Sequence, residues 1–230
     1  MKRFYKDVKV VKTPQGFRFL LDGKPVQTPA RQALLLPSFA LAEAIAEEWR
    51  AQGEEMRPLA MPLTRLVNTV VDGVRANRDE LIPAILRFGE NDLLSYRAEG
   101  PAELARRQAQ WDAWLDWAEK RHGARLGVTS GISHVGQSPE ALGALEKTVK
   151  AQDDYALAAL HVLSSITGSL ILGLAVLEGE LAPTDAFALS RLDEAYQAEN
   201  WGADGEAEER AARLAGEMNQ AARLAALARA

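Results

Sequence analysis

The period of the hydrophobic pattern changes at Pro37-Ser38, and this change constrains the fold more than any other feature of the chain. Before this point apolar side chains alternate with polar or outward-facing ones, as at Phe17, Phe19 and Leu21, which is typical of a half-buried strand. After it they recur every three to four residues, which indicates amphipathic helices. We therefore expect an α+β protein, with a small antiparallel β-rich N-terminal domain followed by a larger all-helical C-terminal domain.

The N-terminal domain is predicted to span residues 1–37. Asp22-Gly23 stands between two apolar segments and indicates a tight hairpin turn, because this dipeptide tolerates the positive φ that such turns require. The expected strands are residues 4–10, 17–21, 25–28 and 33–36. Short turns between consecutive strands predict an antiparallel meander.

Residues 38–62 are expected to form a helix and linker that join the domains, and residues 63–230 to form the helical domain. Ser38 is placed as the N-cap of the first helix. The long apolar segment 155–177 approaches the roughly 20 residues that cross a bilayer. His161, Ser164 and Ser165 interrupt it, however, and acidic residues flank it. We therefore predict a buried central helix and no membrane insertion.

Composition excludes several functions. The chain has 27 Lys and Arg against 32 Asp and Glu, interspersed along the sequence, so nucleic acid is not an expected partner. The absence of cysteine excludes disulfides and thiolate chemistry. The first residues lack the apolar run of a secretory signal and the acid-poor segment of a transit peptide, which favours a bacterial cytoplasmic protein.

No motif indicates catalysis or a bound metal. The three histidines, His122, His134 and His161, fall in different predicted elements without the spacing of a zinc site. The hydroxyls that precede His134 lack the strand-turn-helix context of a nucleophile elbow. We predict no catalytic residue, no metal and no cofactor. One alternative is a small-molecule enzyme with a pocket between the β and helical domains, using His134 and a carboxylate.

The segment 192–202 carries the clearest indication of a binding surface. On a continuous helix its large side chains, with those just before it, fall on two opposite faces. One face carries Leu189, Leu192 and Tyr196, and the other carries Phe187, Glu194, Gln197 and Trp201. Either the helix is sandwiched with both faces buried, or the second face, with its aromatic and charged residues, points outward as a protein-binding anchor.

Five motifs, in order over nearly the whole chain, resemble those of the assembly chaperones that hold the alpha subunit of the ATP synthase catalytic head. They are Arg3-Phe-Tyr-Lys, Leu21-Asp-Gly-Lys-Pro-Val-Gln-Thr-Pro, Ala46-Glu-Glu-Trp, Met61-Pro-Leu-Thr-Arg-Leu-x-Asn-Thr and Leu192-Asp-Glu-x-Tyr-Gln-x-Glu-x-Trp-Gly. Each motif is weak alone, but the ordered set is specific. The resemblance implies the same two-part plan, a β-rich domain before a helical one.

The resemblance also implies a function and a site. Proteins of this family bind the free alpha subunit and shield its subunit-facing surface until the beta subunit replaces them. The implied partner-binding residues are Glu194, Gln197 and Trp201, with Asp92 and Arg97 as weaker candidates and Trp49 as a structural residue. The helical periodicity adds Phe187 to the partner-binding face and places Tyr196 on the structural one. The import sequence of mitochondrial relatives is missing here, which indicates a bacterial member, expected to be monomeric. An adaptor for an unrelated protein is the other alternative.

Overall fold

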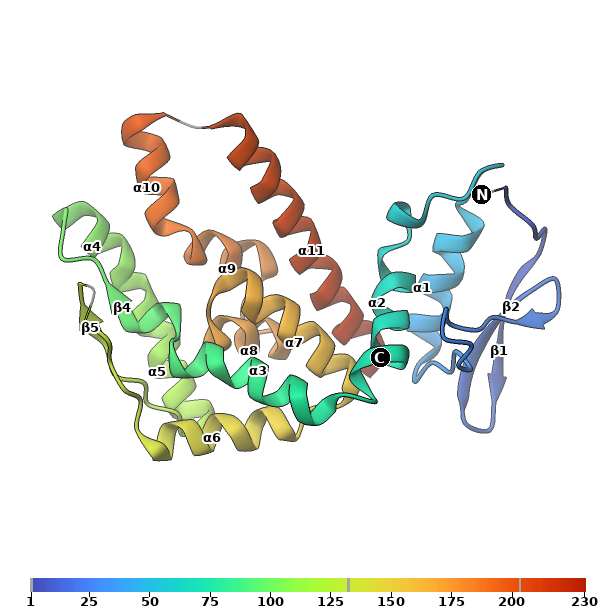
Figure 1. The fold of residues 1–230 in the computed structure, drawn as a ribbon, viewed down its shortest axis with the longest axis horizontal. Helices are drawn as coiled ribbons and strands as arrows, with labels where there is room; N and C mark the ends of the chain where they lie inside the picture. Colours follow the sequence, from blue (N-terminus) through green and yellow to red (C-terminus); the bar gives the residue numbers. More distant parts are fainter. Residues whose placement is uncertain (1, 132, 203) are drawn as a thin grey trace. The chain divides into compact units, whose positions relative to one another are not determined.

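The computed structural model describes residues 2–131, 133–202 and 204–230 and divides into two compact units. The first comprises Met1–Arg78, Asp154–Ala158 and Arg223–Ala230, and the second comprises Asp79–Asp153 and Ala159–Ala222. A small antiparallel sheet near the N-terminus precedes a mostly helical remainder (Figure 1), which confirms the predicted fold class.

The sheet of the first unit is an antiparallel meander in the order β1-β2-β3. Its strands are β1 (Val8–Thr13), β2 (Gly16–Leu21) and β3 (Lys24–Pro25). Asp22 and Gly23 join the last two strands with φ values of 47° and 80°, as the hairpin prediction requires. The Asp22 carboxylate also accepts hydrogen bonds from the backbone of Lys6 and Asp7, at 3.0 and 2.8 Å. These bonds fasten the entry into β1 to the hairpin turn.

The N-terminal prediction is wrong in three places. The expected strand 25–28 is shorter, Lys24–Pro25, with an isolated bridge at Gln27 beyond it. Phe4 is 63% exposed and Tyr5 is buried, because β1 begins only at Val8 and the alternation does not extend back to residue 4. The expected fourth strand, 33–36, makes only single bridges, Phe17 with Leu36 and Gln27 with Ala33. A tight turn precedes that segment, so it does not run beside the sheet for its whole length.

Helix α1 (Phe39–Arg50) begins as predicted, since Ser38 Oγ accepts a hydrogen bond from Leu41 N at 3.0 Å. It packs on β1, β2 and helix α2 (Pro62–Thr69), which continues into a π-helical turn, Val70–Val74. Because these helices pack with the sheet, the first unit continues to Arg78, beyond the predicted boundary at residue 62.

Trp49 of α1 contacts both the sheet and helix α2. Its ring contacts Tyr5 and Phe19, with centroids 5.4 and 5.6 Å apart, and its Nε1 donates to Thr64 Oγ1 at 3.2 Å. Tyr5 Oη also donates to the Trp49 carbonyl at 2.7 Å. These contacts give Trp49 a structural role, although its side chain is only half-buried.

The remaining elements form most of the helical part. They are α3 (Arg78–Glu90), α4 (Ala102–Gln108), α5 (Asp112–His122), α6 (Pro139–Lys150), α7 (Asp154–Thr167), α8 (Leu170–Glu178), α9 (Pro183–Ser190), α10 (Leu192–Trp201), α11 (Gly205–Arg229) and the parallel pair β4 (Tyr96–Arg97) and β5 (Thr129–Ser130). Every residue from Leu170 to Leu177 of α8 is buried, so this helix forms the centre of the second unit's core.

The apolar segment 155–177 is mostly buried, as predicted, although Ser165 is exposed, and it forms two helices instead of one. Gly168 adopts a φ of 67° and ends α7, and Ser169 then caps α8 by accepting from Leu172 N at 3.0 Å. A Cβ at Gly173 would lie 2.6 Å from Ser164 Oγ, so the close approach of α7 and α8 requires glycine there. Among the described residues no helix combines the length and the apolar character that crossing a membrane requires.

Candidate partner-binding site

The helix predicted to carry the site is broken at Arg191. Arg191 has φ −123° and ψ 26°, so α9 ends before it and α10 begins after it. Phe187 and Glu194 therefore do not share one continuous helical face. Tyr196 and Trp201, predicted on opposite faces, make an edge contact with ring centroids 6.3 Å apart. The two-face geometry derived from the sequence is wrong in these respects.

Helix α10 is exposed. None of its residues is buried, and the Trp201 side chain is 76% exposed. Glu194 and Gln197 are exposed as well, and Phe187 on α9 is half-buried beneath the Arg191 guanidinium, 5.6 Å from its ring centroid. The structure therefore excludes a helix sandwiched with both faces buried.

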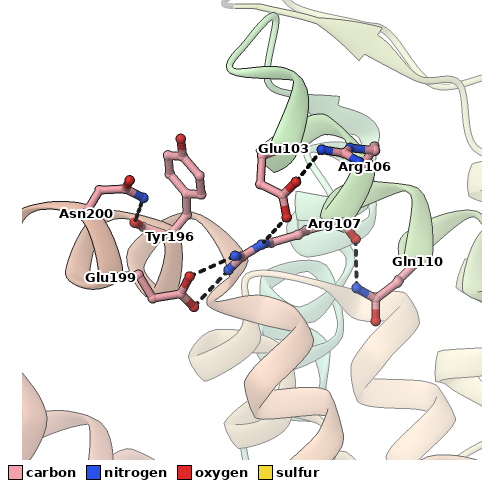
Figure 2. Close-up of polar contacts among 7 residues, drawn as sticks. All are labelled: Glu103, Arg106, Arg107, Gln110, Tyr196, Glu199 and Asn200. Carbon is pink, nitrogen blue, oxygen red and sulfur yellow. Dashed lines mark hydrogen bonds and ion pairs between the residues drawn. The ribbon is translucent and has the colours of Figure 1, made fainter.

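One side of α10 is attached to α4 by polar contacts (Figure 2). The Arg107 guanidinium donates two hydrogen bonds to the Glu199 carboxylate at 2.8 and 2.7 Å and a weaker one to Glu103 at 3.4 Å. It also lies over the Tyr196 ring, 5.6 Å from the centroid. The bond from Arg107 lowers the pKa of Glu199. This cluster was not predicted, because its partners lie about 90 positions apart and no local pattern connects them.

A second polar contact joins the same two helices. Gln108 Nε2 donates to Asp193 Oδ1 at 2.7 Å, and Gln108 Oε1 accepts from Ala98 N at 2.7 Å. Gln108 is buried, so this bond is shielded better than the Arg107 pair. Helix α10 is thus attached to its unit mainly through hydrogen bonds and one ion pair, and little apolar burial holds it.

Removing the Arg107 side chain should loosen α10. We expect Arg107→Ala to increase backbone amide exchange severalfold within residues 192–201 and to leave exchange in α8 unchanged, because a local opening exposes only the detached element. Hydrogen–deuterium exchange with mass spectrometry measures both. Arg106→Ala is the matched control, since Arg106 pairs with Glu103 of its own helix and, in the described part of the chain, with no residue of α10. Equal exchange in the Arg107 variant and the unmodified protein would contradict this role.

Glu194 lines a groove of about 660 Å³ formed with residues of α7 and α11. Its carboxylate lies 3.4 Å from Arg191 Nη1 and its side chain is 52% exposed. The charged lining residues are Glu194, Asp204, Glu206, Glu217, Arg191 and Arg210, and Ile166 and Leu214 add apolar surface. Acidic groups outnumber basic ones, so the groove favours a positively charged group of a partner.

Asp92 does not lie on a surface. It is completely buried, and its carboxylate accepts hydrogen bonds from Leu94 N at 3.0 Å and from Ile171 N at 3.1 Å. The backbone of Leu170 and the Ser169 side chain donate to it as well. Asp92 thus binds the N-terminus of α8, where the helix dipole favours a negative charge. Its predicted contact with a partner is not available to it in this fold.

Burial changes the pKa of Asp92 and so makes the stability of the fold depend on pH. Desolvation raises its pKa to about 6, although the hydrogen bonds to its carboxylate oppose the rise. The folded protein therefore holds this proton more tightly than the unfolded chain does. The resulting stabilisation is fully present below about pH 4 and is lost as the pH rises through about 6.

This titration predicts a measurable pH dependence of stability. Between pH 4 and pH 7 the unfolding free energy of the unmodified protein should fall relative to that of Asp92→Asn by about 2 kcal/mol, because a tenfold change in proton affinity corresponds to about 1.4 kcal/mol. Urea unfolding of both proteins across this range gives the difference. A difference that stays constant with pH would show that Asp92 does not titrate there.

Arg97 is likewise internal. Only 13% of its side chain is exposed, and its guanidinium donates to the Leu94 carbonyl at 3.2 Å, to the Gln108 carbonyl and to Asp112 Oδ1 at 2.7 Å. It also lies 5.2 Å from the ring centroid of Trp111. These hydrogen bonds hold β4 against α4 and α5, so Arg97 stabilises the fold.

The three histidines lie in separate places. His122 packs against Trp117, with its Nε2 3.4 Å from Glu178, and burial lowers the pKa of His122 and of His161. His134 is exposed on a loop, 3.2 Å from Tyr96 Oη, and lines neither the Glu194 groove nor the groove described below. Within the described ranges no three His, Asp or Glu residues are placed to hold a metal. The geometry thus gives the enzyme alternative no support.

Comparison with known proteins identifies the family. The family model described as ATP12 chaperone protein matches residues 2–119. The mitochondrial protein atp12 of Schizosaccharomyces pombe is 27% identical over 222 residues, covering 90% of this chain and 76% of that protein.

Solved structures agree with the family match. The crystal structure of Atp12 from Paracoccus denitrificans is 44% identical, with a TM-score of 0.96 over 99% of this chain and 98% of that one. A protein of Agrobacterium tumefaciens is 47% identical, with a TM-score of 0.91 over 98% of this chain and 85% of that one. The chain therefore belongs to the ATP12 chaperone family, which serves ATP synthase assembly.

Proposed function

We propose that this protein binds the free alpha subunit of the F-type ATP synthase catalytic head in the bacterial cytoplasm. It shields the surface that the alpha subunit presents to its neighbours until the beta subunit replaces it. A monomer is the working unit, and the docking surface is α10 with the adjoining Glu194 groove. The observation that carries the proposal is the exposure of α10, which has no buried residue in a member of a chaperone family.

Trp201 is the proposed apolar anchor of this surface. Its side chain is 76% exposed at the end of α10, where Tyr196 supports one edge of the ring. Tryptophan is among the residues that contribute most to the binding energy of protein interfaces. Gln197 on the same helix and Phe187 on α9 extend the surface. A client contact of about 1,600 Å² in total would give a stable but reversible complex.

Glu194 is the proposed polar recognition residue. Among the residues that the structure describes, Arg191 alone pairs with its carboxylate, at the long distance of 3.4 Å, so it is available to a basic group of the client. The acidic excess of the groove strengthens attraction to such a group. We infer that an arginine or lysine on the subunit-facing surface of the alpha subunit enters this groove while Trp201 packs on an apolar patch beside it.

Aggregation of the isolated alpha subunit tests the proposal. Without nucleotide and without beta subunit, the alpha subunit is incubated at a temperature at which it aggregates, and light scattering is recorded with and without equimolar chaperone. We expect strong suppression of scattering, and added beta subunit should then displace the chaperone and take alpha into assembled head while the scattering stays low. Unchanged scattering in the presence of excess chaperone would overturn the proposal. Serum albumin at the same concentration controls for non-specific protection.

A further inference from the structure

The first unit contains a groove of about 570 Å³ that the proposed chaperone function does not use. It is bounded by β2, the 28–35 segment and the π-helical turn Val70–Val74. Its polar lining includes Arg18, Arg75, Gln15 and Gln32, and Leu35 and Val71 provide apolar surface. The volume lies within the range of about 300–1,000 Å³ that is typical of small-ligand pockets.

Arg18 lacks an internal partner. Its neighbours on β2, Phe17 and Phe19, pack against Phe39 and Trp49 of α1, so alternation places Arg18 on the opposite face of the sheet. Its Nε is shielded from solvent and has no hydrogen-bond acceptor, and within the described part of the chain no carboxylate pairs with its guanidinium. A shielded hydrogen-bond donor without an acceptor costs free energy. An anionic ligand in the groove would supply the acceptor that Arg18 lacks.

The other charges of the groove are already engaged. Asp72 accepts hydrogen bonds from Thr28 Oγ1 at 2.5 Å and from Ala30 N at 3.1 Å. Arg75 Nε lies 3.3 Å from Asp154, and its side chain remains 43% exposed. Asp72 therefore serves to hold the 28–30 turn, and the lining, with two arginines and one aspartate, retains an excess of one positive charge.

The π-helical turn Val70–Val74 forms one side of the groove. Arg75 N donates to Val70 O at 3.2 Å, the i to i+5 bond that defines such a turn. Turns of this kind are rare and occur frequently at functional sites. Here the turn carries Asp72, which contacts the 28–30 segment, and Arg75, which lines the groove, follows directly after it.

We propose that this groove binds a carboxylate-bearing ligand. The carboxylate pairs with Arg18 and Arg75, and a short apolar body lies against Leu35 and Val71. A guanidinium matches a carboxylate through two parallel hydrogen bonds, and Arg18 still has its Nε to offer once its side chain rotates toward the ligand. The carboxylate comes either from a small organic acid or from the C-terminus of a protein segment, and both sources present the same chemistry.

Nuclear magnetic resonance of arginine Nε–H groups in the full-length protein tests the site. Hexanoate, which joins a carboxylate to a short apolar chain, should shift the Arg18 Nε–H signal saturably, and neutral hexanamide should not. Arg18→Gln should weaken hexanoate binding at least tenfold. Arg18→Lys keeps the charge but loses the two parallel N–H donors of the guanidinium, so it should weaken binding as well. Arg57→Gln, a change of an exposed arginine outside the groove, should have no effect.

Two peptides of identical sequence, one with a free C-terminal carboxylate and one amidated, identify the source. Tighter binding of the free-carboxylate peptide than of hexanoate indicates a protein segment, and weaker binding indicates a small organic acid. The proposal is overturned if hexanoate causes no saturable shift, if hexanamide binds equally well, or if both Arg18 variants bind hexanoate like the unmodified protein.

Discussion

Replacing Asp92 by alanine is expected to lower the free energy of unfolding by about 3 kcal/mol at neutral pH. The change leaves the buried backbone N–H groups of Leu94 and Ile171 without an acceptor, and each such group costs about 1–3 kcal/mol. Relief of the desolvation that raises the Asp92 pKa offsets part of this loss. Urea denaturation followed by far-ultraviolet circular dichroism measures the difference.

The matched control for this prediction is Asp92→Asn. The amide oxygen keeps one acceptor at the N-terminus of α8, so the loss should be about 1 kcal/mol, smaller than for alanine. An alanine variant as stable as the unmodified protein would show that Asp92 does not support α8. Partner binding by folded Asp92→Asn should be unchanged, because the side chain has no exposed surface.

Glu194→Lys is expected to abolish suppression of alpha-subunit aggregation while leaving the chaperone folded. The variant removes the acid proposed to receive a basic group of the client and puts a like charge there, and unpaired or opposed charges at an interface cost several kcal/mol. Glu194 is half exposed and bonded only weakly to Arg191, so the thermal midpoint should change little. Light scattering of the client and a thermal melt of the variant are the two readouts.

Glu146→Lys provides the control with the same change of charge. Glu146 is a half-exposed residue of α6 that pairs with Lys150, and it does not line the Glu194 groove. This variant should suppress aggregation as well as the unmodified protein. If Glu194→Lys unfolds, Glu194 is a structural residue and its assignment to the site is wrong. Loss of activity in both variants would instead indicate a general effect of net charge.

The parts of the fold that depend on local interactions could be predicted from the sequence. The Asp22-Gly23 turn and the Ser38 cap were predictable because each depends on one or two residues and their own backbone. Burial of the 155–177 segment followed from composition alone. The interruption of that segment at Gly168 was not predicted, since an isolated glycine is also tolerated within a helix.

The candidate site was predictable only in part. Its residues could be named from the motif at 192–202, and their exposure was one of two alternatives. The break at Arg191 and the contact between Tyr196 and Trp201 could not be derived, because helical periodicity assumes an uninterrupted helix. The burial of Asp92 depends on α8, which is distant in sequence, and tertiary contacts of this kind leave no periodic pattern.

The most direct test is to mix the purified protein with isolated alpha subunit, and separately with assembled catalytic head, and to analyse both by size-exclusion chromatography. We predict that the protein coelutes with free alpha subunit. In the presence of assembled head it should elute alone, because the beta subunit occupies the shielded surface there. Absence of a complex with free alpha subunit, or equal binding to the assembled head, would contradict it.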